Sequence, residues 1–335
     1  MQNYYVSESG RHMYEIRLAP MCGITDHIFR SICYEQGCDL AYTEMISAMG
    51  YLCAPDQRAT QELMIRGKNE RRLILQLFGR DPATVAEAAR RICDLNRFDG
   101  IDLNMGCPAK KIAPSGEGCG LMRTPEIAEK MMRMTVKASG LPVTVKMRLG
   151  YDSDHINVIE YARMAEDAGI AGITVHGRTR EQQYSGKADW DMIARVKESV
   201  NIPVIGNGDI FSADQAMHIK NAYPTDGIMI GRGAMGNPWI FREIKQALSG
   251  HIISPVSNEE KKKMIIAHYR MMLDSKPEHI AVREMRKHVG WYSKGIKDAG
   301  KFRAEINRCT SSKKAMDMIC HFFDCAESNK EPEVI

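Results

Sequence analysis

Residues 100–148 read GIDLNMGCPAKKIAPSGEGCGLMRTPEIAEKMMRMTVKASGLPVTVKMR, and this stretch decides the predicted fold. It begins with the β-rich run Gly100–Met105, continues through the helical pattern Pro125–Ser139, and ends with the β-rich run Val143–Arg148. A strand, a helix and a second strand in this order form a parallel βαβ unit. How often this unit recurs along the chain then determines the fold class.

The same alternation of β-rich runs and helical patterns extends from about residue 16 to residue 248. Eight β-rich runs are present, at Ile16–Met21, Leu40–Glu44, Leu73–Phe78, Gly100–Met105, Val143–Arg148, Gly172–His176, Pro203–Gly206 and Gly227–Gly231. Further helical patterns lie at Pro82–Cys93, Asn157–Ala168, Trp190–Ser199 and Ser212–Asn221. Eight such units close into a TIM barrel, a (β/α)8 fold of the α/β class. An open doubly wound sheet is the alternative, but it usually has a glycine-rich turn after its first strand, and this sequence has none there.

The pattern changes after Gly250, where no further strand is predicted. Three helical patterns follow, at Glu259–Ser275, Ile280–Ser293 and Gly300–Arg308. We therefore expect a barrel domain in residues 1–250, a small C-terminal all-α helical domain in residues 251–328, and a frayed polar tail in residues 329–335.

The composition of the 335 residues, 44% apolar and 26% charged, is that of an ordinary globular protein. No window approaches the ~20 continuous apolar residues that cross a bilayer, and the first residues show no apolar segment typical of a signal peptide. We expect a cytoplasmic protein that does not contact a membrane. The ten cysteines form no CxxC pair, so we expect neither disulfides nor a metal site, and most of these cysteines should be small buried hydrophobes.

Four predicted strands carry a polar side chain near their C-terminal ends, namely Gln76, Asn104, Lys146 and His176. Because successive side chains of a strand point to opposite faces, the alternate apolar residues face outward and these four face the barrel interior. Barrel enzymes build their active sites at this end. A single such residue is equally well explained as a satisfied core group, but four together indicate a bound polar ligand, because burying them without partners would be costly.

The last two predicted strands end in glycine-rich loops, IPVIGNGDI at residues 202–210 and GIMIGRGAMGNPWIF at residues 227–241. Glycines let backbone N–H groups approach an anion, and these loops form the usual phosphate site of TIM barrels. Flavin mononucleotide (FMN) fits these parts. The residues expected to hold it are Lys146, Gln76 and Asn104 at the ring, and Asn207 to Asp209, Gly231 and Arg232 at the phosphate.

Cys107 follows the fourth predicted strand in a loop that contains several glycines. Such a long, exposed loop suits an active-site lid. A thiol with a pKa near ~8.5 is mostly protonated at neutral pH, so Cys107 can give a proton to a developing carbanion. Cys119, on the far side of the loop, is the rival candidate, and an inert loop cysteine is the alternative explanation.

The net charge of +4 does not by itself suggest nucleic acid, but its distribution is more telling. Between Arg283 and Arg303, seven basic residues are opposed only by Glu284 and Asp298. This pattern is typical of a surface that binds phosphates, and a solvated helix face is the alternative.

The sequence resembles the tRNA-dihydrouridine synthases, and most of all their bacterial B-type branch, over roughly residues 16–310. The combination of DLNMGCP with HGRT and NGDI is highly specific. The matching segments are LAPMCGITDHIFR at 18–30, TEM at 43–45, LQLFGRDP at 75–82, DLNMGCPAKK at 102–111, VTVKMRLG at 143–150, ITVHGRTREQQYSGKADW at 173–190, IPVIGNGDI at 202–210, IMIGRGAMGNPWIF at 228–241 and REMRKHVGWYSKG at 283–295.

This resemblance implies an FMN-bearing catalytic barrel and a helical domain that binds RNA, with tRNA as the expected substrate and NADPH as a transient reductant. It implies that hydride passes from flavin N5 to C6 of a uridine, while Cys107, which matches the family's catalytic acid, protonates C5 to give 5,6-dihydrouridine. The positions implied around the flavin are Pro20, Met21, Gln76, Asn104, Lys146, His176, Asn207, Gly208, Asp209, Gly231 and Arg232. The positions expected to contact substrate or RNA are Lys110, Arg178, Arg283, Arg286 and Lys287.

Three other functions stay open. They are the same chemistry on ribosomal RNA, an FMN barrel that acts on a free pyrimidine or an enone, and a non-catalytic, flavin-containing RNA-binding protein. The chain departs from the family where Gly118-Cys119-Gly120-Leu121-Met122 replaces the usual GSALL or GAALM, which leaves the closed form of the loop open. The sequence predicts neither the modified nucleotide nor the oligomeric state.

Overall fold

The computed structural model describes residues 14–328, and the chain divides into two compact units between Arg232 and Gly233. The predicted boundary at residue 250 lies later, because the residues before it associate with the second unit. The Trp239 ring packs edge-on against Tyr292, with ring centroids 6.0 Å apart, and Arg242 forms a 2.8 Å ion pair with Glu260. The tail predicted for residues 329–335 lies outside the described residues.

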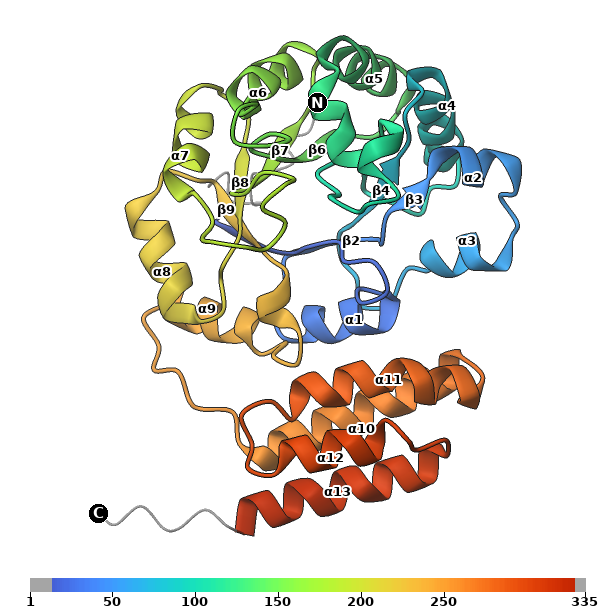
Figure 1. Cartoon of the computed structure of the whole chain (residues 1–335), viewed down its shortest axis with the longest axis vertical. Coiled ribbons are helices and arrows are strands. Elements are labelled where there is room, and N and C mark those ends of the chain that lie inside the picture. Colours follow the sequence, from blue (N-terminus) through green and yellow to red (C-terminus); the bar gives the residue numbers. More distant parts are fainter. Residues whose placement is uncertain (1–13, 329–335) are drawn as a thin grey trace. The chain divides into compact units, whose positions relative to one another are not determined.

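The first unit is a closed parallel barrel (Figure 1). Its strands are β1 (Glu15–Leu18), β2 (Leu40–Tyr42), β3 (Ile46–Ser47), β4 (Leu73–Phe78), β5 (Gly100–Met105), β6 (Val143–Arg148), β7 (Gly172–His176), β8 (Val204–Asn207) and β9 (Gly227–Ile230). β9 pairs with β1, which closes the ring, and β2 and β3 both pair with β4. The short β3 therefore continues the position of β2, and the barrel has the eight strand positions of the predicted TIM barrel. An open doubly wound sheet is excluded.

Helices surround the barrel and connect its strands (Figure 1). They are α1 (His27–Glu35), α2 (Ala48–Cys53), α3 (Arg58–Leu63), α4 (Pro82–Cys93), α5 (Pro125–Ala138), α6 (Val158–Asp167), α7 (Trp190–Glu198) and α8 (Ala213–Ala222), with 3-10 turns η1 (Ala113–Ser115) and η2 (Gly118–Arg123) after β5. Side chains cap several of them. Asp81 accepts from the Thr84 N–H before α4, and Asp189 accepts from the Met192 N–H before α7. Each such cap contributes about 1 kcal/mol and fixes where the preceding active-site loop ends.

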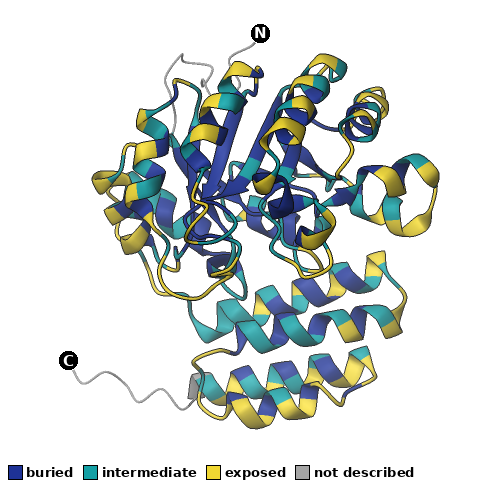
Figure 2. Ribbon diagram, turned by 45° about the horizontal axis from the view of Figure 1, so that its top comes forward, coloured by how far each residue is buried: buried dark blue, intermediate teal, exposed yellow. Residues whose placement is uncertain are grey.

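The barrel core is formed by the strands, which Figure 2 shows as buried, while the connecting helices expose their outer faces. The first predicted strand, Ile16–Met21, extends too far, because β1 ends at Leu18. The N–H of Ala19 still bonds to the Ile230 carbonyl, but Pro20 has no N–H with which to continue the ladder. The chain therefore leaves the sheet at Pro20 and forms the first loop of the barrel mouth.

The second unit consists of α9 (Ile240–Leu248), α10 (Asn258–Ser275), α11 (Glu278–Tyr292), α12 (Ala299–Ile306) and α13 (Ser312–Ser328). The three predicted helices correspond to α10, α11 and α12. α13 was not predicted, although Ala315, Ile319 and Phe323 recur at helical spacing and are all buried. No helix within residues 14–328 is long and apolar enough to cross a membrane.

Candidate active site

The C-terminal ends of the barrel strands bring the predicted polar side chains onto neighbouring strands. In the parallel register Asn104 lies opposite Lys146, and His176 lies opposite Asn207. Gln76 lies opposite Asp102, two residues before Asn104 on β5. Because residues paired in this way point to the same face, side chains predicted from five separate strands form one site.

Hydrogen bonds connect Gln76 and Asn104 to the cysteine loop. Asn104 donates from Nδ2 to Oε1 of Gln76 at 2.8 Å, and its Oδ1 accepts from the backbone N–H of Cys107 at 2.9 Å and of Gly106 at 3.1 Å. Gln76 donates from Nε2 to Oδ2 of Asp102 at 2.7 Å. Asp102 was not among the predicted site residues, although its place on the same strand face as Asn104 is visible in the sequence.

Asp102 and Lys146 place opposite charges inside the barrel. Burial raises the pKa of Asp102 to about 6, although hydrogen bonds from Thr144 and Gln76 favour its carboxylate. Burial, followed by the positive charge of Arg148, lowers the pKa of Lys146 to about 8, and Asp102 opposes this shift. Across residues 14–328 the Lys146 ammonium makes no hydrogen bond or ion pair. It is a half-buried cation that can serve an acceptor on a ligand.

His176 is a neutral imidazole in this site. Its side chain is buried at the end of β7, and burial holds its pKa well below 6.5. The neighbouring cations Arg148 and Lys146 lower this pKa further, and Arg178 and Arg232 add to the effect. His176 therefore offers one N–H donor and one nitrogen acceptor to a ligand and no charge.

Cys107 is half-buried, whereas its rival Cys119 is fully buried. The Cys119 thiol points to the Gly150 carbonyl, with its Sγ 3.7 Å from that oxygen, and burial raises the pKa of Cys119 to about 12. The backbone N–H of Cys119 bonds to the Cys107 carbonyl at 3.2 Å. Cys119 is therefore packed inside the loop, and of these two thiols only that of Cys107 is partly exposed to solvent.

The loop between β5 and α5 is less exposed than predicted for a lid. Lys110 and Lys111 are exposed, but Gly118 to Met122 in η2 are buried. A Cβ on Gly120 would lie only 2.2 Å from the carbonyl oxygen of Ala113. The departure from the family sequence at this position therefore lets η1 and η2 pack closer than an alanine would allow.

Asp209 connects the loops that follow β7, β8 and β9. Its carboxylate accepts from Nη2 of Arg178 at 2.7 Å, from the backbone N–H of Ala188 at 2.8 Å and from Nη2 of Arg232 at 3.1 Å. Burial alone would raise the pKa of Asp209, but the Arg178 hydrogen bond and the neighbouring charges lower it below its usual value. Asp209 is ionised at neutral pH and orients both arginines.

Arg178 is 1% exposed, and its expected contact with substrate or RNA stays a prediction. Its guanidinium donates to the carbonyl oxygens of Ser185 and Gly186 as well as to Asp209. These loop carbonyl oxygens can accept from any well-placed N–H group, and here the Arg178 guanidinium supplies the donors. Arg178 therefore holds the loop after β7 in place by hydrogen bonds within that loop and to Asp209.

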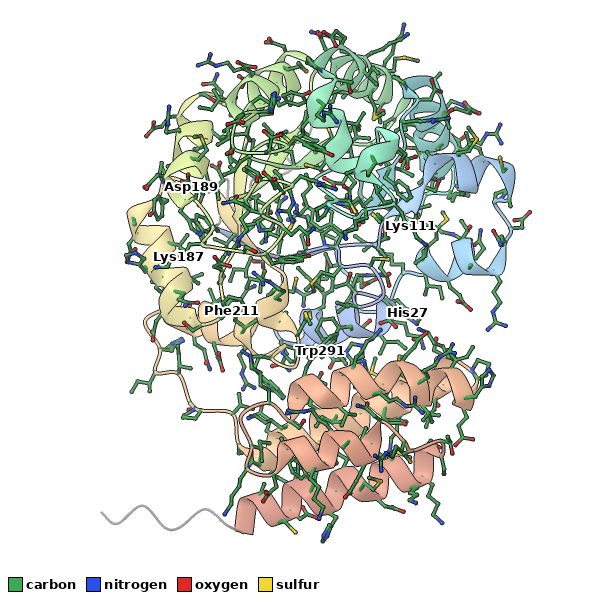
Figure 3. The ribbon with its side chains drawn as sticks, viewed as in Figure 1. His27, Lys111, Lys187, Asp189, Phe211 and Trp291 are labelled. Carbon is green, nitrogen blue, oxygen red and sulfur yellow. The ribbon has the colours of Figure 1, made fainter. Side chains whose placement is uncertain are left out.

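Two aromatic side chains at the mouth were not predicted from the sequence. The Arg232 guanidinium lies 4.5 Å from the Tyr184 ring centroid and 5.7 Å from that of Phe211. Figure 3 shows Phe211 and Lys187 on one side of the barrel mouth and Lys111 on the other. Tyr184 and Phe211 are 55% and 46% exposed, so their rings are available to a ligand. In the sequence they are two aromatic residues in predicted loops, with no pattern that marks them as part of a site.

The residues at the mouth fit FMN in two respects. The Lys146 ammonium and the buried Nη1 of Arg178 both lack a hydrogen-bond partner among the described residues. The ring and phosphate oxygens of FMN are acceptors that suit such groups. Gly208 has a φ of +136°, and a Cβ there would lie 2.6 Å from the Ala188 Cβ, so only glycine fits this loop. The role of this loop as a phosphate site stays a prediction.

The remaining predicted residues are placed as follows. Pro20 and Met21 are half-buried in the loop after β1, and a Cβ on Gly231 would lie 3.6 Å from the Met21 sulfur. The Asn207 amide is already used, because Nδ2 donates to the Met229 carbonyl at 2.7 Å and ties β8 to β9. The contacts of these residues with a flavin stay predictions.

The three basic residues predicted on the second unit differ in exposure. Arg283 is exposed and Lys287 is half-buried. Arg286 is half-buried and donates from Nη2 to the Cys309 carbonyl at 2.9 Å, so it stabilises the segment before α13. Glu284, which opposes them in sequence, is paired with Lys276 at 2.6 Å. Arg283 is therefore the most exposed of the three.

The cysteines outside this site are scattered over the described part of the chain. Only four of the ten are buried, namely Cys33, Cys38, Cys119 and Cys309. The prediction that most of them are buried hydrophobes is therefore wrong. Cys22, Cys53 and Cys325 are exposed instead.

Comparisons with known protein families and sequences identify relatives over most of the chain. A family model described as dihydrouridine synthase (Dus) matches residues 17–329. The chain is 37% identical over 314 residues to tRNA-dihydrouridine synthase B of Shewanella oneidensis, covering 92% of this chain and 95% of the relative. It is 40% identical over 323 residues to a probable tRNA-dihydrouridine synthase of Rickettsia conorii, covering 95% of this chain and 96% of the relative.

A solved structure, that of histamine dehydrogenase from Rhizobium sp. 4-9, resembles the chain with a TM-score of 0.55 at 13% sequence identity. The match covers 96% of this chain and 63% of the dehydrogenase chain. At this identity the likeness shows the fold alone.

Proposed function

The chain belongs to the dihydrouridine synthase family, and from this premise we propose that it reduces uridine in tRNA to 5,6-dihydrouridine with bound FMN. The observation that carries the proposal is the half-buried Cys107, whose backbone N–H is held by Asn104, the residue opposite the unpartnered cation of Lys146. The names of the relatives, which are tRNA-dihydrouridine synthases, support tRNA as the substrate.

Reduced FMN, when bound, supplies a hydride to the substrate. The residues proposed to hold it are Gln76, Asn104, Lys146 and His176 at the ring, Asn207, Gly208, Asp209, Gly231 and Arg232 at the phosphate, and Pro20 and Met21 in the first loop. Lys146 would place positive charge at a ring edge, where its unpartnered ammonium gains an acceptor. Because His176 is neutral, it would orient the ring by hydrogen bonding without adding a further cation.

Cys107 would donate its thiol proton to C5 of the uracil. A well-placed proton donor contributes about 10²–10⁴-fold to the rate. The hydrogen bonds that Asn104 Oδ1 accepts from the backbone N–H groups of Gly106 and Cys107 would fix the backbone of Cys107 and so the direction from which the proton arrives. Burial removes Cys119 from this role, since its sulfur already lies against the Gly150 carbonyl.

NADPH is the proposed reductant, and it would alternate with RNA at the mouth of the barrel. The target uridine has to leave its base stack to reach the site, at a cost of a few kcal/mol. Exposed cations such as Lys110 and Arg283 would contribute phosphate contacts that offset this cost. The cytoplasmic location stays a prediction from the sequence.

The experiment that tests this function compares three purified proteins: the native chain, Cys107→Ala and Cys119→Ser. We expect the native protein to contain FMN and to form dihydrouridine in tRNA that lacks it, measured by nucleoside mass spectrometry with NADPH supplied. Cys107→Ala should keep its flavin and its reduction by NADPH but lose RNA turnover by about 10²-fold or more. Cys119→Ser, the matched control, should retain turnover.

Full RNA turnover in Cys107→Ala would remove this residue from the chemistry. Mapping of dihydrouridine in total RNA, from cells with and without the gene, decides between transfer and ribosomal RNA. Reduction of a free pyrimidine or an enone without activity on RNA would favour the broader class of FMN barrels. Flavin binding and RNA binding without turnover would indicate a non-catalytic protein.

A further inference from the structure

We propose that Asp102 is a positioning residue that holds the backbone of Cys107 through a fixed chain of two amide side chains, Gln76 and Asn104. Each link is a hydrogen bond of 2.7 to 2.9 Å, from Gln76 to Asp102, from Asn104 to Gln76 and from the Cys107 N–H to Asn104. Asp102 and Gln76 are 0% and 1% exposed, so water does not compete for these bonds. The inference rests on the proposed role of Cys107 as the proton donor.

The two ends of the chain fix the direction of every bond in it. At one end, the N–H groups of Gly106 and Cys107 can only donate, so Asn104 has to present Oδ1 to them. Its Nδ2 then faces Gln76, which has to present Oε1. This leaves Nε2 of Gln76 facing Asp102, an ionised carboxyl that only accepts.

Asp102 is suited to this role because its other oxygen is also engaged. Thr144 donates from Oγ1 to Oδ1 of Asp102 at 2.6 Å, which leaves Oδ2 for Gln76. Within residues 14–328, no hydrogen bond or ion pair joins Asp102 directly to Cys107. The amides connect the two by hydrogen bonds, and the charge of Lys146 acts on both. Asp102→Asn removes the charge of Asp102 and keeps the hydrogen-bonded amides, so it separates the two routes. The backbone N–H of Gln76 is separately fixed by Thr43 Oγ1 at 3.1 Å, which leaves only the side chain to rotate.

The first test compares Asp102→Asn, Asp102→Leu and the control Thr144→Val. Asparagine can present its oxygen to Gln76 and its NH2 group to the Thr144 hydroxyl, so the chain stays intact. Leucine has a similar volume but offers Gln76 no acceptor, so the Gln76 side chain can rotate and its Oε1 is no longer held against Asn104. Thr144→Val disturbs the same carboxylate from the other side and leaves the chain in place.

The readout is the rate at which iodoacetamide alkylates Cys107 in the flavin-free and the flavin-bound protein, followed on its peptide by mass spectrometry. We expect Asp102→Leu to change this rate by about threefold or more and to lower RNA turnover about ten- to hundredfold. Asp102→Asn and Thr144→Val should both stay near the native alkylation rate. Equal effects of Asp102→Leu and Thr144→Val would indicate a general disturbance of the core and overturn the proposal.

The second test exchanges the polarity of the two ends and does not depend on an apolar substitution. Asn104→Asp alone places a carboxylate oxygen against Oε1 of Gln76 and should change Cys107 alkylation. In the exchange variant Asp102→Asn with Asn104→Asp, the Gln76 amide can turn around, donate to position 104 and accept from position 102. We expect the exchange to restore the alkylation rate and the melting temperature towards native values.

If the effects of Asp102→Asn and Asn104→Asp simply add in the exchange variant, without restoration, the proposed hydrogen-bond chain is ruled out. These measurements separate the inference from the proposed function. If Cys107→Ala retains RNA turnover, the proposed role of Cys107 as proton donor is wrong. The alkylation rates of the position 102 variants still test the hydrogen-bond chain. If Asp102→Leu is alkylated at the native rate while Cys107→Ala loses turnover, only the proposed role of Asp102 is wrong.

Discussion

At the scale of single residues, burial changes the pKa values of two titrating groups of the barrel, His176 and Asp102. His176 lies among cations and is buried, so its pKa is held well below 6.5. Asp102 lies beneath them and is buried too, so its pKa is raised to about 6. In both cases burial penalises the charged form; the neighbouring cations add to this effect at His176 and oppose it at Asp102.

His176 should stay neutral throughout the physiological pH range. Since its pKa in the folded state is depressed, the unfolded chain takes up a proton below pH 6.5 that the folded protein does not, and stability is lost as the pH falls. In an NMR titration between pH 8 and pH 6, the imidazole signal of His176 should not move. The variant His176→Asn identifies that signal by its loss. A titration midpoint near 6.5 would contradict the neutral assignment.

Asp102 should make the protein less stable as the pH rises from about 4 to about 6. Its folded pKa lies above the ordinary value of 3.8, so the stabilising contribution is complete below that value and is lost through pH 6. The shift of about two pKa units corresponds to roughly 2–3 kcal/mol. Urea unfolding at pH 4 and pH 7 should show this loss in the native protein and not in Asp102→Asn. Parallel changes in both proteins would mean that another group is responsible.

At the scale of elements, the loop between β5 and α5 depends on a close backbone approach. A Cβ on Gly120 would lie 2.2 Å from the Ala113 carbonyl oxygen, so Gly120→Ala has to push η1 away from η2. Overpacking of this kind costs about 1–3 kcal/mol. Because Cys119 bonds to the Cys107 carbonyl, the shift should also reduce RNA turnover.

The matched control for this loop is Gly140→Ala, in the turn before β6, where a Cβ would meet nothing within 4 Å. Thermal melting and turnover should both fall in Gly120→Ala and stay native in Gly140→Ala. Equal behaviour of the two variants would show that the loop has room for the alanine that the family usually carries.

The sequence predicted the elements whose signal is periodic and missed those whose signal depends on tertiary contacts. β4 to β7 were predicted with their bounds because apolar and polar residues alternate along them. The polar residues of these strands, such as Gln76 and Lys146, could be assigned to one face for the same reason. Tyr184 and Phe211 lie in loops without periodicity and approach Arg232 only after the barrel closes. The burial of Arg178 likewise follows from carbonyl groups that the folded loop brings to it.

At the scale of the whole molecule, the chain combines a barrel whose proposed role is the chemistry with a helical unit whose proposed role is to bind RNA. The small net charge of +4 does not show where the basic residues cluster, because acidic residues elsewhere balance the basic stretch in α11 and α12. Phosphate contacts give affinity without reading sequence, so the position of these contacts would select the uridine that reaches Cys107. Charge removal on the second unit should therefore change binding and leave the chemical step intact.

The double variant Arg283→Gln with Lys287→Gln should bind tRNA more weakly than the native protein. For each cation that no longer meets a phosphate, the log–log slope of affinity against salt concentration should become shallower by about one. The control Lys130→Gln with Lys137→Gln removes the same charge from exposed positions on α5. Arg286→Gln should lower the melting temperature instead, since Arg286 holds the Cys309 carbonyl. If both double variants lose affinity equally, net charge and not the surface of α11 controls RNA binding. The proposal that the helical unit binds RNA would then be wrong.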